Sequence, residues 1–411
     1  METHPLSQSQ LEIYWEQIQH PESIEYNLPA SFRLSKSVDV ERLKRAIRSV
    51  IEFYPIFRTR VITQNGELRQ YSDDNLQIDI PVIYISEEEV EQQISEFIRP
   101  FDPQKEALIR SLLIETPVAL YFILDVYHLI WDGVSYALMM HFIDMAYSNQ
   151  PLVREQMSLY EYAEQEILSI GTPSYQRAAT YYKEKFKDVE MTRLAQKNSH
   201  EGCIMRKKAF ITRELIDDFC AQQGVTPNLL FMSAFEIVLS RFSGEKNIAY
   251  ATFNHGRIDK KLRGSLGVFI KTAPILIRIN ETQELIDFIK SHKHEFMSTI
   301  HFGIFPFLHF CRQQGISSEL INFGFQGDIA EEMIFCGENV KGEQRLSSGL
   351  SAEEPSVLVY WMHKTYEIRL QYVECQYEDD YMQRFIDAMV ACIEQILISP
   401  NSLLKDISII S

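Results

Sequence analysis

The sequence predicts an α/β or mixed α+β fold, in which sheets and helices form a two-layer sandwich. Stretches rich in β-branched and aromatic residues alternate with stretches whose apolar residues recur at helical spacing. A length of 411 residues, 45% of them hydrophobic, is sufficient for two domains of roughly 150 to 200 residues with full cores. Both halves contain sheet and helix signals, which is compatible with a duplicated architecture.

The first half has four segments with a clear signal. They are a helix at 39–54, a strand at 57–62, a strand at 118–128 and a helix at 135–147. The first helix stops before Pro55, because the residue before a proline disfavours helical geometry. The stretch VYHLIWDGVS at 126–135 therefore lies where a buried strand ends and a helix begins.

The second half follows a connecting helix and linker, where the apolar pattern weakens around 170–200. The expected elements are strand 207–212, helix 226–244, strand 249–254, a bent strand or strand pair at 264–279, strands 357–364 and 366–374, and a final helix at 379–398. Thr226 suits the N-cap of its helix, Pro227 the first turn and Gly244 the residue after the last turn.

Composition excludes several classes of protein. The formal net charge of −17 argues against a nucleic-acid binder, because phosphate contacts require a basic face. The six cysteines lie in the second half without metal-ligand spacing, which is typical of reduced cysteines. The polar amino terminus does not resemble a signal peptide, and no run approaches the ~20 apolar residues of a membrane helix. We therefore expect a cytoplasmic protein with no membrane partner.

His128, at the end of the expected strand, is the candidate reacting group. An imidazole with a pKa of about 6.5 accepts a proton near neutral pH, and general-base assistance contributes about 10² to 10⁴ in rate. Asp132 can hold the turn through a buried ion pair, and Gly133 permits close approach of the backbone. The same residues also fit an ordinary structure, with His128 in the core and Asp132 or Ser135 as a helix cap.

The stretch YHLIWDGVS resembles the HHxxxDGxS signature of the condensation domains of nonribosomal peptide synthetases. Further stretches are similar to other motifs of that family, in the family's order. They are PLSQSQLEIYW at 5–15 (the opening motif), FYPIFRTRV at 53–61 (RHxxLRTxF), LYEYA at 159–163 (YxDFA), LGVFIKTAPI at 266–275 (IGxFVNTxPL), HFGIFPF at 301–307 (the HQDxPFE region) and INFGF at 321–325 (a late FNF-like strand). The resemblance therefore covers essentially the whole chain.

This resemblance implies two chloramphenicol-acetyltransferase-like subdomains that form a pseudo-dimer around a central tunnel. We expect an N-terminal subdomain with the HxxxDG loop at 1–175, a connecting helix and linker at 176–204, and a C-terminal subdomain at 205–411. Donor and acceptor carrier proteins would present substrates on 4'-phosphopantetheine arms for amide (peptide) bond formation by acyl transfer. The resemblance implies no metal and no bound cofactor, and a monomer or a module of a larger synthetase.

The family assigns the catalytic role to the second histidine of the signature, which is His128 here. We expect His128 to accept or relay the proton of the attacking amine. The backbone N–H of Gly133 is expected to stabilise the developing oxyanion. Asp132, the third member of the catalytic loop, is a poor base, because a buried carboxylate needs a partner; we expect it to pair with an arginine.

Four further residues are expected to support the site. Arg257, in the NHGR stretch, is the first choice as the partner of Asp132, and Arg58 is the second. Ser135 is expected to cap the helix rather than to react. Tyr127 replaces the first histidine of the signature, and its effect on substrate choice stays open.

Other departures from the family also concern the substrate more than the fold. Phe53 and Tyr54 replace the first arginine and the histidine of the RHxxLRT motif, and Lys271 replaces the asparagine of the later motif. The acid-base glutamate of epimerisation domains falls on Phe253, which argues against epimerisation. Heterocyclisation domains replace the signature histidines with aspartates, which this chain does not.

Two alternative functions remain open at this point. An ester-forming HxxxD acyltransferase would use the same base to deprotonate a hydroxyl group. A condensation-like domain without catalysis, which recruits partner proteins, usually loses the second histidine. Carrier proteins are usually acidic, so docking would need local cations on this acidic chain. The candidate patches are Arg206, Lys207 and Lys208, or Lys260, Lys261 and Arg263, although an ordinary solvated charged face is the commoner explanation for such clusters.

Overall fold

The structure is a computed structural model, which describes residues 2–196, 204–303, 305–307, 311, 320–326, 333–340, 342–344 and 355–409. Its internal contacts divide the chain into two compact units. Unit 1 comprises Met1–Ile170, His255–Ile270 and Ala330–Gly349, and unit 2 comprises Gly171–Asn254, Lys271–Ile329 and Leu350–Ser411.

These units differ from the subdomains expected at 1–175 and 205–411. Segments 255–270 and 330–349, expected in the C-terminal subdomain, belong to unit 1. Much of the expected linker at 176–204 is part of unit 2. The difference arises because local patterns indicate helix or strand, whereas long-range packing decides which unit a segment joins. Residues 197–203 of that linker, with Cys203, and residue 304 of the HFGIFPF stretch lie outside the described residues.

The main sheet of unit 1 has the strand order β14-β2-β7-β6-β5, and only the β5–β6 pair is parallel. Its strands are β2 (Asn27–Leu34), β5 (Val82–Tyr84), β6 (Ile109–Glu115), β7 (Leu120–Tyr127) and β14 (Gly342–Gln344). Two small sheets accompany it, formed by β1 (His4–Pro5), β4 (Glu67–Ser72) and β3 (Thr59–Gln64), and by β12 (Met333–Phe335) and β13 (Glu338–Val340).

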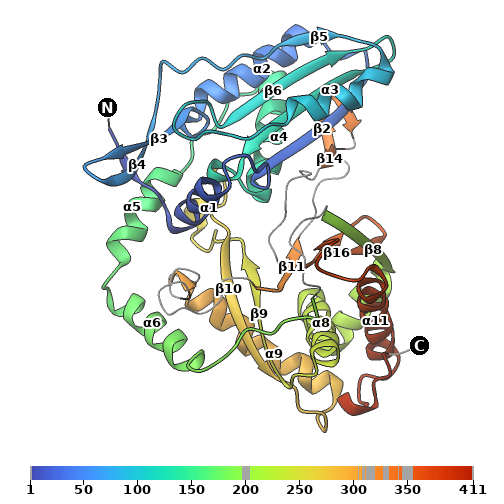
Figure 1. Ribbon diagram of the computed structural model, residues 1–411. Helices are drawn as coiled ribbons and strands as arrows, with labels where there is room; N and C mark the ends of the chain where they lie inside the picture. Colours follow the sequence, from blue (N-terminus) through green and yellow to red (C-terminus); the bar gives the residue numbers. More distant parts are fainter. Residues whose placement is uncertain are drawn as a thin grey trace. The chain divides into compact units, whose positions relative to one another are not determined.

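Helices cover both faces of this sheet, in the blue to teal part of Figure 1. α2 (Val40–Phe53) and α4 (Gly133–Tyr147) pack on one face and α3 (Val90–Phe97) on the other, whereas α1 (Gln8–Gln19) adjoins the turn after β7 and α5 (Leu159–Ser169) adjoins β1. Because side chains alternate along a strand, Phe122 and Leu124 of β7 face the core with α2 and α4, whereas Ile123 faces α3. β7 is thus buried on both faces, which explains why its sequence is apolar except for Asp125.

Unit 2 contains a six-stranded mixed sheet with the order β10-β9-β11-β15-β16-β8. Its strands are β8 (Ile204–Thr212), β9 (Asn247–Asn254), β10 (Lys271–Arg278), β11 (Asn322–Gln326), β15 (Ser356–Trp361) and β16 (Thr365–Val373). β9 and β10 pair directly, with Asn254 opposite Lys271. The intervening residues 255–270 leave this hairpin and belong to unit 1.

The helices of unit 2 cover its sheet unequally. They are α6 (Pro173–Lys185), α7 (Arg213–Gln223), α8 (Pro227–Ser243), α9 (Leu285–His301) and α11 (Asp379–Ile398). One sheet face packs against α7, α8, α9 and α11, with Tyr250, Phe323 and Ile368 in this core. On the opposite face, α6 contacts the β9 end of the sheet through a second core that includes Ala249 and Ala251.

Most elements expected from the sequence are present with small shifts. α8 has Thr226 as N-cap, Pro227 at its start and Gly244 as C-cap, as predicted. The strand expected at 57–62 begins only at Thr59, because a short 3-10 helix (Pro55–Arg58) precedes it. Of the expected bent strand or strand pair at 264–279, only β10 is strand.

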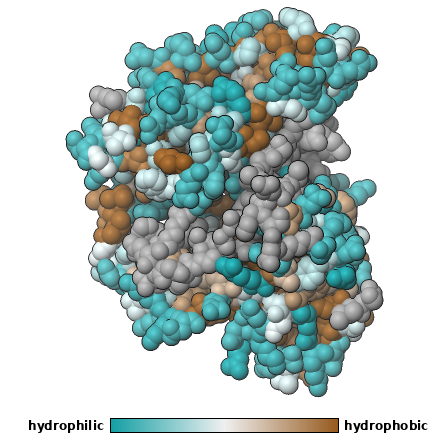
Figure 2. Space-filling model, viewed as in Figure 1, coloured by the Kyte–Doolittle hydropathy of each residue, from teal (hydrophilic) through white to brown (hydrophobic). Residues whose placement is uncertain are grey.

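Hydrophilic residues predominate on the face shown in Figure 2, with small groups of hydrophobic residues among them. This distribution is ordinary for a folded protein, because polar atoms cannot cover the whole surface. Within the described residues, no helix is both long and apolar enough to cross a membrane.

Candidate active site

The predicted catalytic loop connects β7 to α4 in unit 1. After β7 ends at Tyr127, a 3-10 turn (His128–Ile130) follows, and α4 begins after its N-cap, Asp132. The backbone N–H of His128 donates to the carbonyl of Tyr26 at 2.8 Å. Trp131 is only 1% exposed, so an apolar anchor and backbone hydrogen bonds hold both sides of the turn.

The ring of His128 is oriented by the backbone of its own turn. Its Nδ1 lies 2.6 Å from the carbonyl oxygen of Trp131. A carbonyl oxygen only accepts hydrogen bonds, so Nδ1 carries the proton and donates it. The neutral imidazole therefore has its free lone pair on Nε2, as required of a proton acceptor.

Burial favours the neutral form of this imidazole. Desolvation lowers the pKa of His128 from 6.5, while the nearby Asp132 carboxylate and backbone hydrogen bonds act in the opposite direction. The side chain nevertheless retains partial exposure, and the ring of Tyr26 lies 6.3 Å from it. The His128 imidazole is thus largely desolvated but partly exposed.

Asp132 and Arg257 form the predicted ion pair. Arg257 donates from Nη1 to Oδ2 at 2.6 Å and from Nη2 to Oδ1 at 2.9 Å, and both side chains are only 3% exposed. Asp132 also accepts from the backbone N–H groups of Ser135 and Phe269, each at 3.0 Å. With its oxygens occupied in this way, the Asp132 carboxylate shapes the loop and has little capacity to act as a base.

Ser135 joins the same network instead of presenting a free hydroxyl group. Its oxygen accepts from Arg257 Nη2 at 3.0 Å and from the backbone N–H of Gly267 at 2.9 Å. Its single proton is directed at Asp132 Oδ1 or the Gly267 carbonyl. The prediction that Ser135 caps α4 was wrong, because Asp132 is the N-cap and Ser135 lies in the first turn of the helix.

A glycine lets the segment 255–270 reach this network. Gly256 has φ of +68°, and a Cβ atom built there would lie 1.7 Å from the carbonyl oxygen of Phe269. Only glycine fits both the backbone conformation and the space. Gly256 therefore sets the direction of Arg257, whose guanidinium also lies 4.6 Å from the centre of the Phe269 ring.

Sequence reasoning missed Glu155, which holds the other side of this segment. Its Oε1 accepts from the backbone N–H of Leu266 at 2.6 Å. Burial raises the pKa of Glu155 to about 7, although that hydrogen bond and Arg257 act to lower it. No local pattern marks this residue, because its environment depends on a partner 111 positions away.

Arg58, the second choice as partner of Asp132, has a different role. Its Nη1 donates to the carbonyl oxygens of Ile51 and Glu52 at the end of α2, at 2.9 and 2.6 Å. These carbonyls have no partner within the helix, and an arginine there also complements the helix dipole. The guanidinium forms its ion pair with Asp74.

Tyr127 is fully buried beside the loop, against the ring of Phe101 at 5.6 Å. Its hydroxyl group has no hydrogen-bonding partner among the described residues, and burial raises its pKa. The backbone N–H of Gly133, the first of α4, likewise has no partner within that part of the chain. Gly133 itself is exposed.

The opening motif also contributes to the loop, which the sequence did not predict. The Nε2 of Gln10, in α1, donates to the carbonyl of Leu129 at 3.1 Å. Gln10 is fully buried and completes the capping box of α1 with Ser7. One glutamine therefore links the start of the chain to the turn that carries His128.

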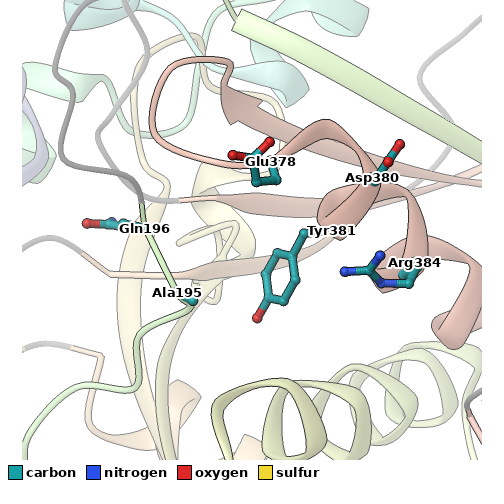
Figure 3. A pocket seen from close by; sticks show the side chains of 6 residues that line it. All are labelled: Ala195, Gln196, Glu378, Asp380, Tyr381 and Arg384. Atoms are coloured by element: carbon teal, nitrogen blue, oxygen red, sulfur yellow. The ribbon is translucent and has the colours of Figure 1, made fainter.

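A separate depression, of about 380 Å³, lies in unit 2 at the start of α11 (Figure 3). Its lining consists of Ala195, Gln196, Glu378, Asp380, Tyr381 and Arg384. Neither a histidine nor a cysteine lines it. The described residues contain no cluster of histidine, cysteine and carboxylate side chains suited to a metal ion.

Comparisons with known proteins agree on one family. The family model described as "Condensation domain" matches residues 1–411. Surfactin synthase subunit 2 of Bacillus subtilis (strain 168) is 24% identical over 323 residues, covering 74% of this chain and 9% of that protein. Tyrocidine synthase 2 of Brevibacillus parabrevis is 26% identical over 299 residues, with coverages of 70% and 8%. The chain thus spans less than a tenth of these relatives.

Solved structures show the same fold. The starter condensation domain of rhizomide synthetase superposes with a TM-score of 0.86 at 16% identity, over 100% of both chains. The first condensation domain of the calcium-dependent antibiotic synthetase, in complex with a substrate analogue, gives 0.85 at 14% identity, over 100% of both chains. The predicted fold class is confirmed.

Proposed function

This chain belongs to the condensation-domain family, and we propose that it transfers an acyl or peptidyl group from a carrier-protein thioester to an amine. Condensation domains of nonribosomal peptide synthetases are acyltransferases that form amide bonds. The observation that carries the proposal for this chain is the orientation of His128. Its Nδ1 is occupied by the Trp131 carbonyl, and Nε2 is left to accept a proton.

In the proposed reaction the amine nitrogen attacks the thioester carbonyl carbon, and His128 Nε2 accepts a proton from that nitrogen. The carbon–sulfur bond then breaks, and the proton passes from the imidazole to the leaving thiolate. Amide and free thiol are the products. A desolvated, neutral imidazole suits both steps, because it is unprotonated before attack and its cation is a good acid afterwards.

Gly133 is the proposed donor to the oxygen of the tetrahedral intermediate. Its N–H is the first of α4, where the helix dipole favours negative charge. Removal of one such donor has cost about 2.7 to 4 kcal/mol where measured. Asp132, Arg257 and Ser135 act as positioning residues, since their polar atoms are engaged with one another and with segment 255–270.

Carrier proteins bearing 4'-phosphopantetheine are the proposed partners for both substrates. The relatives are long synthetases, of which this chain spans only a small part. Of the two cationic patches expected from the sequence, Lys260, Lys261 and Arg263 are all exposed and follow Arg257 in unit 1. Charge reversal at these positions should raise the KM for carrier-bound substrate and leave thermal stability unchanged.

The decisive experiment compares His128→Ala with Tyr127→Phe, using carrier-bound donor and acceptor. We expect His128→Ala to lose about 10² to 10⁴ in turnover with an unchanged melting temperature. Tyr127→Phe, at the neighbouring position, should retain most activity. Unchanged turnover in His128→Ala would overturn base catalysis by His128, whereas absence of turnover in the wild type would favour a recruitment module.

An acceptor substrate that carries a hydroxyl group distinguishes an ester-forming acyltransferase from an amide-forming one. The same base can deprotonate a hydroxyl group, so amine and hydroxyl analogues of one acceptor should be compared at equal concentration. Faster turnover of the hydroxyl analogue would replace amide formation with ester formation as the activity of this site.

A further inference from the structure

The cations Arg206, Lys207 and Lys208 of β8 do not form one patch. Side chains alternate along a strand, so Lys207 points to the helix-covered face, where it pairs with Asp379 of α11. Arg206 and Lys208 are exposed on the opposite face of the sheet. Arg206 and Lys208 can therefore act together, whereas Lys207 cannot join them.

A third cation joins Arg206 and Lys208 from the neighbouring strand. Arg369 of β16 lies directly opposite Lys208, and Gln371 lies opposite Arg206. Opposite residues of an antiparallel pair share a face, and diagonal neighbours are about 7 to 8 Å apart. Arg206, Lys208 and Arg369 therefore form a cationic cluster on the face of the sheet away from α11.

The cationic cluster contains one carboxylate. Glu367, only 3% exposed, lies 2.6 Å from Arg369 Nη2 and 3.3 Å from Lys208 Nζ. The guanidinium of Arg369 lies 4.4 Å from the centre of the Tyr360 ring, a cation–π contact. Three cations thus face one carboxylate, an excess of two positive charges on a chain whose net charge is −17.

Arg206 is the member without a partner. Among the described residues no hydrogen bond or ion pair engages its guanidinium. Desolvation and the neighbouring charge of Arg369 both lower its pKa. An anion placed near both guanidinium groups would relieve the repulsion between Arg206 and Arg369.

From this arrangement we propose that the cationic cluster binds a phosphate dianion, with Arg206 as the bidentate donor. The planar fork of arginine matches phosphate geometry, whereas a lysine acts as a point charge. A dianion balances the two excess positive charges of the cationic cluster, whereas a carboxylate carries only one negative charge. The site lies in unit 2 on strands β8 and β16, and its residues do not include those of the His128 loop (Figure 1).

The test measures binding of inorganic phosphate by isothermal titration calorimetry at pH 8, with the whole chain. We expect Arg206→Gln to weaken binding about tenfold or more, as for lost hydrogen bonds to a charged group. Arg206→Lys keeps the positive charge but lacks the planar guanidinium, so its affinity for phosphate should lie between those of the wild type and Arg206→Gln. Lys246→Gln is the matched control, because it removes an exposed cation of unit 2 whose side chain is 68% exposed.

Two further probes define the ligand. Dimethyl phosphate carries a single charge and should bind more weakly than inorganic phosphate. Glycerol phosphate represents a free metabolite, and a phosphoserine peptide represents a phosphorylated protein. The probe that binds more tightly identifies which of these supplies the phosphate group. The proposal is overturned by absence of binding, by an unchanged affinity in Arg206→Gln, by an equal loss in Lys246→Gln, or by equal binding of dimethyl phosphate.

Discussion

At the scale of single residues, the hydrogen bond from His128 Nδ1 to the Trp131 carbonyl fixes the tautomer and the orientation of the imidazole. The lone pair of Nε2 is therefore free to accept a proton. The other ring nitrogen, Nδ1, is held by a backbone carbonyl and not by a carboxylate. The imidazole depends on its backbone for orientation, so conservative changes of nearby side chains should affect it less than changes of the turn itself.

The pH dependence of turnover reports on this imidazole. Burial lowers the pKa of His128 from 6.5, and only the neutral ring can accept a proton. We therefore expect activity to fall as the pH decreases through a midpoint below 6.5, and to be constant above it until another group titrates. A midpoint of kcat/KM at or above 6.5 would show that another group is the base.

Tyr127 provides a second prediction at this scale. Its buried hydroxyl group has no partner among the described residues, so Tyr127→Phe should leave the free energy of unfolding unchanged or raise it. Tyr54→Phe is the matched control, because the Tyr54 hydroxyl donates to the carbonyl of Val153 at 2.8 Å. That variant should lose about 1 kcal/mol in denaturant titrations. Equal losses in both variants would indicate a partner for Tyr127.

At the scale of elements, segment 255–270 completes a loop that ends 123 residues earlier in the sequence, at Asp132. Four backbone or side-chain groups of that segment contact Asp132 or Ser135: the Arg257 guanidinium, the Gly267 N–H and carbonyl, and the Phe269 N–H. Segment 255–270 therefore supplies hydrogen bonds that hold the start of α4, next to the turn that carries His128.

A double-mutant cycle tests that dependence. Removal of one member of a buried pair leaves the other charge uncompensated, so Asp132→Ala and Arg257→Ala should each lose about 3 to 5 kcal/mol. The double mutant should lose less than the sum of the two. The exposed pair Lys105–Asp102 is the control, and Lys105→Ala should cost at most about 1 kcal/mol. Small, additive losses for Asp132 and Arg257 would contradict a structural pair.

At the scale of the whole molecule, one half-buried carboxylate should make stability depend on pH near neutrality. Burial raises the pKa of Glu155 from 4.5 to about 7. The folded state therefore binds this proton more tightly, and the resulting stability is complete below pH about 4.5 and is lost as the pH rises through about 7. Its size is at most about 3 kcal/mol.

Thermal melts between pH 5 and pH 8 measure this effect. The melting temperature of Glu155→Gln should vary less with pH than that of the wild type, because the amide oxygen still accepts from the Leu266 N–H but does not titrate. Glu22→Gln removes an exposed carboxylate of the same unit and should behave as the wild type. A Glu155→Gln profile identical to the wild type would contradict the raised pKa.

The sequence alone determined the local structure and the candidate reacting residue. Helix α8 begins and ends at caps that can be read from Thr226, Pro227 and Gly244, because capping depends on neighbours within one turn. β7 and α4 follow from apolar periodicity, which places His128 between them. The order of motifs then identified the family, which the match over residues 1–411 confirms.

Only the tertiary structure decided which distant segments complete the site. Arg257 was chosen correctly over Arg58 through family resemblance, but neither residue has a local signal for its partner. Glu155 and Gln10 were missed, because their roles depend on backbone groups 111 and 119 positions away. Local patterns report helix, strand and turn, whereas burial and charge pairing depend on which chain segments meet after folding.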